Sequence, residues 1–405
     1  MHTVDQALEA IKLNVEPGPV ETVPLSDALG RVLAEPIDSD IDSPPFDKAL
    51  MDGFAVRAED VADGTATLTV IDEVTAGQVA SQAIQPGQAI QIMTGAPIPD
   101  GADAVVQVED TSIENKDLLV LVSIDTRPVT PGRNMIHQGT SMRQGDTVMP
   151  AGRQLRPQEL GLLAELGRQS LVVHRQVTVG VLATGDELVT IDCQPGAGQI
   201  RNSNEAMLAA QVRACGAVAH ELGIARDNPE DLSARIADGL ECDVLLLSGG
   251  VSAGRLDLVP AQLEAAGVKE IFHKVKVKPG KPVWFGTSPG SIVFGLPGNP
   301  VSSMVCFELF VRTALRRLVG LSPAQPAAAA ARLARDFEFR GDRPTYFPGR
   351  LEHHSDGPRV TPIDWHGSSD LRSTADANAM IHFPAGDQAY QAQQWVEVFE
   401  WSGRA

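Results

Sequence analysis

Basic charge, aromatic side chains and cysteines are all scarce in this chain of 405 residues. The 33 Lys and Arg residues are outnumbered by 52 Asp and Glu residues, which gives a formal charge of −19. Because attraction to phosphate requires a basic surface, such a chain is expected to repel nucleic acids and anionic membranes. Aromatic residues make up only 4% of the chain, so stacking platforms for bases are poorly supplied. The composition therefore argues against a nucleic-acid partner.

Several common motifs are absent as well. The four cysteines are widely spaced without a CxxC pair, which argues against a structural zinc site or a disulfide scaffold. No apolar run approaches the roughly 18 residues of a membrane span, and the acidic N-terminal segment is unlike a signal peptide. We therefore expect a cytoplasmic protein without a membrane partner. With no Walker A sequence, and no GxGxxG after the first strand, ordinary ATPase and dinucleotide-binding functions lack support.

The first half of the chain combines helical and alternating patterns. Apolar spacing predicts a helix over Thr3–Leu13, opened by a capping-box pair, and a second short helix that starts at Ser26 and includes Leu33. Between Ser43 and Arg127, short alternating segments are separated by Gly, Pro and Asp, which predicts a β-rich insertion. Helical character returns at Pro157.

From Val177 onward, apolar strands alternate with helices. We expect strands at Val177–Ala183, near Val218, at Val244–Leu247 and at Ser291–Leu296. This alternation predicts a parallel sheet covered on both faces, with ligands at the carboxyl ends of its strands. A hinge is expected at Ser322–Ala331, followed by a small C-terminal β-domain.

Two of the strand ends carry residues suited to a metal and an anion. The turn TGDEL places Asp186 and Glu187 where carboxylates can hold a hard cation, but taken alone this turn favours helix capping or solvent exposure. The turn SGGVSAGRLD frees backbone amides for an anion and ends at Asp257, which can bind a metal that bridges a phosphate. A plain turn that needs glycine for positive φ is the alternative.

A lysine-rich run, HKVKVKPGKP, follows in the same α/β unit. Its alternation places Lys274, Lys276 and Lys278 on one face of a strand-like segment, with Lys281 in the turn after it. An edge strand protected by lysines is the competing interpretation. Cations beside free amides and carboxylates nevertheless suit a phosphate–metal ligand. In the next turn, PGNPVSS, Asn299 is a candidate for a polar ligand or for simple helix capping.

Eight segments, taken in order, resemble the molybdopterin molybdenumtransferase family, which includes MoeA-like proteins and the E domain of gephyrin. They are FDKALMDGFAV, IMTGAPIPDGADAVV, GVLATGDELV, IRNSNEAML, LLLSGGVSAGRLD, KVKVKPGKP, GLPGNPVSS and HGSSDLRSTADANAMI. One such motif is a weak signal, whereas eight in order across residues 43–382 are specific.

The resemblance implies a multidomain fold of the α/β plus β class. It consists of a helical, mixed dimerisation domain (1–43 and 132–172), a β-rich insertion domain (44–131), a central doubly wound α/β molybdopterin-binding domain (173–322) and a small C-terminal β-barrel (323–405). The implied reaction inserts molybdate into adenylylated molybdopterin and releases AMP with the help of Mg²⁺. A homodimer is implied, and the pterin adenylyltransferase of the same pathway is an implied partner.

The resemblance also assigns site residues by position. The implied catalytic residues are Asp52, Thr94, Glu187, Asp227, Asp257, Lys274 and Lys278. The implied substrate-binding residues are Ser248, Gly249, Gly250, Ser252, Pro297, Gly298, Asn299, Arg343 and Ser368. The implied metal ligands are Glu187, Asp227 and Asp257. Because the family's cleft lies between two subunits, Asp52 and Thr94 are expected to act in trans.

Two other functions remain open from the sequence. Adenylylation of molybdopterin by ATP uses the same kind of α/β unit, although the additional β-rich and C-terminal domains argue against it. A non-catalytic scaffold is the second alternative, because the gephyrin E domain also binds receptor tails. The chain has no long linker or clustering domain that would favour a scaffold.

Overall fold

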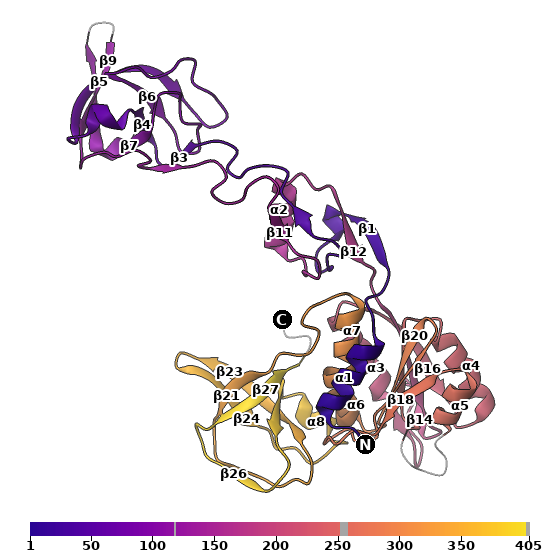
Figure 1. Cartoon of the computed structure of the whole chain (residues 1–405). Helices are drawn as coiled ribbons and strands as arrows, with labels where there is room; N and C mark the ends of the chain where they lie inside the picture. The colour runs from indigo at the N-terminus through magenta and orange to yellow at the C-terminus, as the bar shows by residue number, and fades with distance from the viewer. Residues whose placement is uncertain (117–118, 252–257, 402–405) are drawn as a thin grey trace. The chain divides into compact units, whose positions relative to one another are not determined.

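The computed structural model describes residues 1–116, 119–251 and 258–401. The chain forms two compact units, each of which is drawn in Figure 1. The smaller one, which we call the insertion unit, consists of Pro36–Pro150 and Leu162–Arg168. The larger one consists of Met1–Glu35, Ala151–Gly161 and Gln169–Ala405. No helix in the described ranges is both long and apolar enough to cross a membrane.

The insertion unit is built around a six-stranded sheet in the order β7-β4-β6-β5-β9-β8. Its strands are β4 (Gly53–Val56), β5 (Thr65–Val74), β6 (Gln88–Ile92), β7 (Ala104–Gln107), β8 (Thr111–Lys116) and β9 (Leu119–Asp125). Side chains alternate between its two faces, so that Phe54 and Ala55 enter different hydrophobic clusters. The β-rich insertion predicted from the sequence is confirmed.

Smaller elements complete this unit. They are the strand pairs β2 (Ile37–Asp38) with β11 (Thr147–Met149) and β3 (Lys48–Ala49) with β10 (Met135–Ile136), and the short helices η2 (Ala58–Val61) and η3 (Val108–Asp110). The helix α2 (Pro157–Glu165), predicted from Pro157, begins in the larger unit.

The larger unit contains a second six-stranded sheet, in the order β16-β13-β17-β20-β19-β18. Its strands are β13 (Thr178–Thr184), β16 (Val218–Ala225), β17 (Val244–Ser248), β18 (Lys269–His273), β19 (Trp284–Ser288) and β20 (Ser291–Leu296). The first four strands in this order are parallel, as predicted. The sequence analysis missed the other two: β19 pairs antiparallel with β20, and β18 pairs antiparallel with β19. Only two residues join β19 to β20, and so tight a connection allows only antiparallel pairing.

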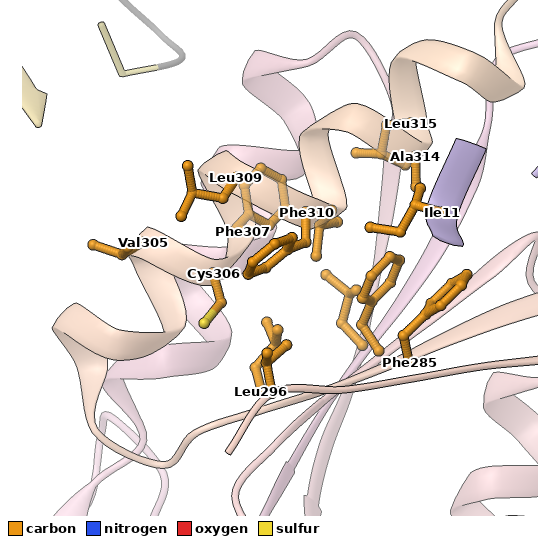
Figure 2. Close-up of a cluster of buried hydrophobic side chains, with 14 of the residues drawn as sticks. Ile11, Phe285, Leu296, Val305, Cys306, Phe307, Leu309, Phe310, Ala314 and Leu315 are labelled. Carbon is orange, nitrogen blue, oxygen red and sulfur yellow. The ribbon is translucent and has the colours of Figure 1, made fainter. Parts of the chain in front are cut away.

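Helices cover both faces of this sheet, so the doubly wound α/β arrangement is confirmed. The helices are α1 (Val4–Asn14), α3 (Ser203–Ala214), α4 (Pro229–Gly239), α5 (Val259–Ala265) and one long helix formed by α6 (Pro300–Cys306), the π-helical turn η4 (Phe307–Val311) and α7 (Arg312–Leu318). Figure 2 shows Ile11 of α1 and Phe310 of the long helix in the core that also contains Phe285 and Leu296 of the sheet. The opposite face packs against α4 through Ile236 and against α5 through Leu263.

The N-terminal predictions had mixed outcomes. The first helix is confirmed, including its capping box between Thr3 and Gln6. The helix predicted from Ser26 is wrong, because only one short turn, η1 (Leu25–Asp27), forms there. Gly30 then adopts a φ of 77°, which turns the chain away from a helix, and Leu33 forms a β-bridge instead. Nearby, β1 (Val20–Pro24) pairs with β12 (Ser170–His174).

The C-terminal region forms the closed barrel that was predicted. Its strands are β21 (Ala329–Leu333), β23 (Thr345–His354), β24 (Gly357–Pro362), β25 (Ala379–Phe383) and β27 (Trp395–Glu400), joined by α8 (Leu371–Thr374) and the pair β22 (Phe337–Phe339) and β26 (Gln388–Tyr390). A small parallel pair, β14 (Leu188–Val189) and β15 (Ile200–Arg201), follows the strand β13.

Candidate functional site

A hollow of about 750 Å³ opens at the carboxyl ends of β13, β17 and β20, where ligands bind such sheets. We call it the glycine hollow. It is lined, among others, by Thr184, Glu187, Asn204, Asp227, Ser248, Gly249, Gly250, Pro297, Gly298 and Asn299. The structure thus brings together three of the turns that the sequence analysis singled out.

The backbone of the SGG turn has room only for glycine at its centre. Gly249 adopts a φ of 102°, and a Cβ atom there would lie 2.6 Å from the carbonyl oxygen of Thr184. Its own N–H donates to the carbonyl of Leu296 at 3.0 Å, which joins the end of β17 to the end of β20. This turn therefore forms part of the hollow's wall with main-chain atoms rather than side chains.

Asn204, which the sequence analysis did not select, connects two walls of the glycine hollow. Its Nδ2 donates to Ser248 Oγ and to the carbonyl of Gly298, both at 2.7 Å. Its Oδ1 and the hydroxyl of Thr184 are buried without a hydrogen-bond partner among the described residues. Leaving such atoms unpaired costs about 1–3 kcal/mol each.

A signal for Asn204 was present in the sequence. The segment IRNSN contains two asparagines, and Asn202 alone caps α3 by accepting from the backbone N–H of Glu205. A second asparagine within the first helical turn is therefore available for another role.

Carboxylates lie on a further side of the glycine hollow. Glu187 and Asp227 both line it, and Asp186 Oδ1 accepts from the backbone N–H of Asp227 at 3.2 Å. The turn TGDEL is followed by β14 and not by a helix, so the helix-capping interpretation of its carboxylates is wrong. Ser252 and Asp257 lie outside the described residues.

A second hollow, of about 840 Å³, lies beside the first. We call it the basic hollow, and Lys278, Lys281, Arg340 and Arg343 line it together with Ser302 and Ser368. Pro282, Pro297 and Asn299 belong to the linings of both hollows. The two hollows therefore adjoin, and a ligand that spans them would contact amides and carboxylates in one and cations in the other.

The lysine run is not a strand, which corrects the sequence prediction. β18 ends at His273, and Lys274 adopts a φ of 70°, a left-handed conformation that ends the strand. The backbone of Lys278 is held instead by the barrel: its N–H donates to the carbonyl of Pro344, and its carbonyl accepts from the N–H of Tyr346.

The lysines of this run therefore lie in different environments. Lys278 and Lys281 line the basic hollow, whereas Lys276 is exposed. Lys274 is not part of either described lining, and its backbone pairs with His2 and Val283. Buried valines at 275 and 277 keep the alternation that the sequence showed, but in an irregular segment packed under the long helix.

The C-terminal candidates meet the PGNP turn. Asn299 Nδ2 donates to Ser368 Oγ at 2.9 Å, and the N–H of Val301 donates to the carbonyl of Ser368 at 3.0 Å. The side chain of Asn299 makes no capping hydrogen bond, so the capping interpretation is wrong for this residue. Arg343 Nε donates to Asp342 at 3.2 Å, and this bond lowers the pKa of the Asp342 carboxyl.

Asp52 and Thr94 lie together in the insertion unit. Asp52 Oδ1 accepts from the backbone N–H of Thr94 at 2.6 Å and from its hydroxyl at 2.7 Å. Both bonds hold the pKa of Asp52 below its usual value, and the bond from the Thr94 hydroxyl has the larger effect. Both side chains are exposed, so the carboxylate is accessible.

Comparison with known proteins covers almost the whole chain. A molybdopterin molybdenumtransferase of Bacillus subtilis (strain 168) is 36% identical over 401 residues, which span 98% of this chain and 93% of that protein. The chain belongs to the molybdopterin molybdenumtransferase family. The resemblance seen in the sequence motifs is thereby confirmed, and with it a transferase of molybdenum cofactor biosynthesis.

Other comparisons agree with this family. Models of the MoeA N-terminal region (domain I and II), of a probable molybdopterin binding domain and of the MoeA C-terminal region (domain IV) match residues 2–167, 180–317 and 330–401. A molybdopterin molybdenumtransferase of Nostoc sp. is 37% identical over 94% of this chain and 88% of that protein. The crystal structure of a molybdopterin biosynthesis MoeA protein from Pyrococcus horikoshii OT3 has a TM-score of 0.84 at 32% identity, covering 99% of this chain and 100% of that one.

Proposed function

We propose that this chain inserts molybdate into adenylylated molybdopterin and releases AMP. The observation that carries the proposal is the pair of adjoining hollows: one contains the glycine-rich turn with Glu187 and Asp227, and the other contains Lys278, Lys281, Arg340 and Arg343. Two anionic substrates that must react with each other need two such sites with a common boundary. Pro282, Pro297 and Asn299 form that boundary.

Molybdate suits the basic hollow. It is a tetrahedral oxyanion, and Lys278, Lys281 and Arg343 offer it positive charge while Ser302 and Ser368 offer hydroxyl groups. In a chain of net charge −19, such a local group of cations is what allows an anion to approach and remain.

The phosphoanhydride of the adenylylated pterin suits the glycine hollow. Its walls include the glycine-rich turn at Ser248–Gly250, where a main chain without side chains allows phosphate oxygens to approach closely. Catalysis would then consist of positioning the two substrates and stabilising charge, without a covalent nucleophile.

The residues of the glycine hollow also fit Mg²⁺. This ion is usually held by one or two carboxylates together with substrate phosphates, and Glu187 and Asp227 both line the hollow. Within the described residues there is no group of three or more His, Cys, Asp or Glu side chains that could hold a metal ion. Bound there, Mg²⁺ would neutralise charge on the anhydride. Asp257 remains our proposal for a third ligand.

The central test is release of AMP from adenylylated molybdopterin in the presence of molybdate and Mg²⁺. We expect turnover that depends on molybdate, and its absence would contradict the proposal. Supplying molybdopterin with ATP tests the adenylyltransferase alternative, because only that activity would accumulate the adenylylated pterin. A scaffold would show no thermal stabilisation by AMP, molybdate and Mg²⁺.

We also propose that the cytoplasmic enzyme is a homodimer, joined through residues 1–43 and 132–172, in which Asp52 and Thr94 serve the partner's site. The four-domain division and the interaction with the pterin adenylyltransferase belong to the same proposal. Mixing the impaired variants Asp52→Ala and Lys278→Ala tests it sharply. If the residues act in trans, a mixed dimer contains one intact site and regains activity, whereas action in cis leaves every site defective.

A further inference from the structure

The basic hollow has an aromatic wall that an oxyanion does not require. Phe337, Phe339, Phe347 and Trp365 all line it, in a chain whose aromatic content is 4%. All four side chains come from the C-terminal region, which places them on the barrel side of the hollow. Lysines and arginines bind molybdate without help from apolar rings, so this wall points to a second kind of ligand group.

The rings of this wall hold one another in place. Phe347 meets Trp365 edge to face, with centroids 5.2 Å apart and planes at 90°, and Phe337 meets Phe347 at 5.1 Å. Phe337 in turn stacks on Phe383 of the barrel core at 5.1 Å. Such contacts fix ring positions before any ligand arrives, which lowers the entropy lost on binding.

Part of this aromatic surface is left uncovered. Phe337, Phe347 and Trp365 are only partly buried, although each belongs to a packed aromatic cluster. The indole Nε1 of Trp365 has no acceptor among the described residues, so ring packing rather than a hydrogen bond positions this side chain. Covering the remaining apolar surface with a flat ligand is favourable.

Cations line the same hollow as the wall. Lys278, Lys281 and Arg343 line the same hollow as Phe347 and Trp365. An aromatic surface next to several cations suits a planar ring that carries a negatively charged group, because one part stacks while the other pairs with charge.

We propose that this wall, and Trp365 and Phe347 in particular, positions a planar heteroaromatic ring of the substrate. The inference rests on the proposed function, which supplies a substrate with two such rings, the pterin and the adenine. Both have the required chemistry, and the experiment below separates them.

The test compares Trp365→Leu with Trp395→Leu. Trp395 is a matched control, because it also lies on the barrel but is 53% exposed and packs on Arg332 away from the hollow's lining. AMP alone, neopterin monophosphate alone and molybdate alone are titrated against each variant, and KM and kcat for AMP release are measured with the full substrate.

We expect Trp365→Leu to weaken binding of one of the two ring ligands, and to raise KM, by about 10-fold or more, the usual worth of one base–aromatic stack. Molybdate affinity and kcat should stay near those of the wild type, and Trp365→Phe should recover most of the loss. Weakened AMP binding assigns the adenine to the wall, and weakened pterin binding assigns the pterin.

Unchanged KM together with unchanged binding of both ring ligands would overturn the inference. An equal loss of molybdate binding would also overturn it, because the wall would then merely support the hollow. Neither result touches the proposed function, which fails only if the wild-type chain releases no AMP.

Discussion

The two adjoining hollows are made of different material. The glycine hollow is formed largely by turns at the ends of three neighbouring strands, and its critical contacts are main-chain ones such as the approach of Gly249 to Thr184. The basic hollow is lined mainly by charged and aromatic side chains, from the segment around Lys278, from the segment around Arg343 and from the segment around Trp365. A backbone site tolerates little change in shape, whereas a side-chain site depends on charge. Substitutions in the glycine hollow should therefore lower both stability and activity, whereas substitutions in the basic hollow should lower activity with little change in stability.

The largest effect is expected from Gly249→Ala. Its Cβ would lie 2.6 Å from a backbone oxygen at a φ of 102°, so the turn must move. We expect AMP release to fall below detection and stability to fall by about 3 kcal/mol, as measured by denaturant unfolding. Gly290→Ala is the matched control, because that glycine has a φ of 92° with no atom within 4 Å of the added Cβ. Equal damage in both variants would show that backbone strain, and not the shape of the hollow, is responsible.

The next largest effect is expected from Lys278→Ala in the basic hollow. Removing one positioned cation should lower kcat/KM for AMP release by about 100-fold, with little change in melting temperature, because the side chain is not part of the core. Lys276→Ala is the control, since Lys276 lies two residues away and is exposed. Wild-type kcat/KM in Lys278→Ala would contradict our assignment of molybdate to this hollow.

A smaller effect is expected from Asn204→Ala, which removes two hydrogen bonds between the walls of the glycine hollow. At about 1 kcal/mol net for each bond, the loss of about 2 kcal/mol of stability should lower the melting temperature by a few degrees, and the altered walls should raise KM by about 10-fold. Asn14→Ala, which removes one exposed hydrogen bond at the end of α1, should change neither quantity by as much. If Asn204→Ala keeps the wild-type KM, the two hydrogen bonds of Asn204 have no part in substrate binding.

The smallest effect is expected from Thr94→Val in the insertion unit. The Thr94 hydroxyl is the largest cause of the lowered pKa of Asp52, so its removal should raise that pKa toward the ordinary value. A lowered pKa adds stability above the pKa of the unfolded chain, and this stability is lost as pH falls through the folded value. The free energies of unfolding of the wild type and the variant should therefore differ less in acid than at neutral pH. An NMR titration of the Asp52 carboxyl checks the direction, and no change in its pKa would contradict it.

The glycine hollow was largely predictable from the sequence. Its turns follow strands whose apolar runs were evident, and the carboxyl ends of parallel strands meet at one edge. The turn at Ser248–Gly250 and the carboxylate Glu187 therefore had to lie near each other once the sheet was inferred. Asn204 was missed because an asparagine at a helix start has an ordinary explanation as a cap.

The basic hollow was less predictable. The alternation of Lys274, Lys276 and Lys278 indicated a strand, but alternation follows equally from buried Val275 and Val277 in an irregular segment. Which lysine enters the hollow depends on backbone hydrogen bonds to Pro344 and Tyr346 in the barrel, and local sequence does not encode such distant contacts. The role proposed for Trp365 depends on the same long-range packing.

The hydrogen bond between Asn299 and Ser368 has a consequence for how the two cavities open. Asn299 belongs to both linings, and its amide is fastened to the barrel. Any displacement of the barrel from the sheet would therefore reshape both compartments at once. Breaking this one hydrogen bond is therefore expected to alter the lining of both hollows together.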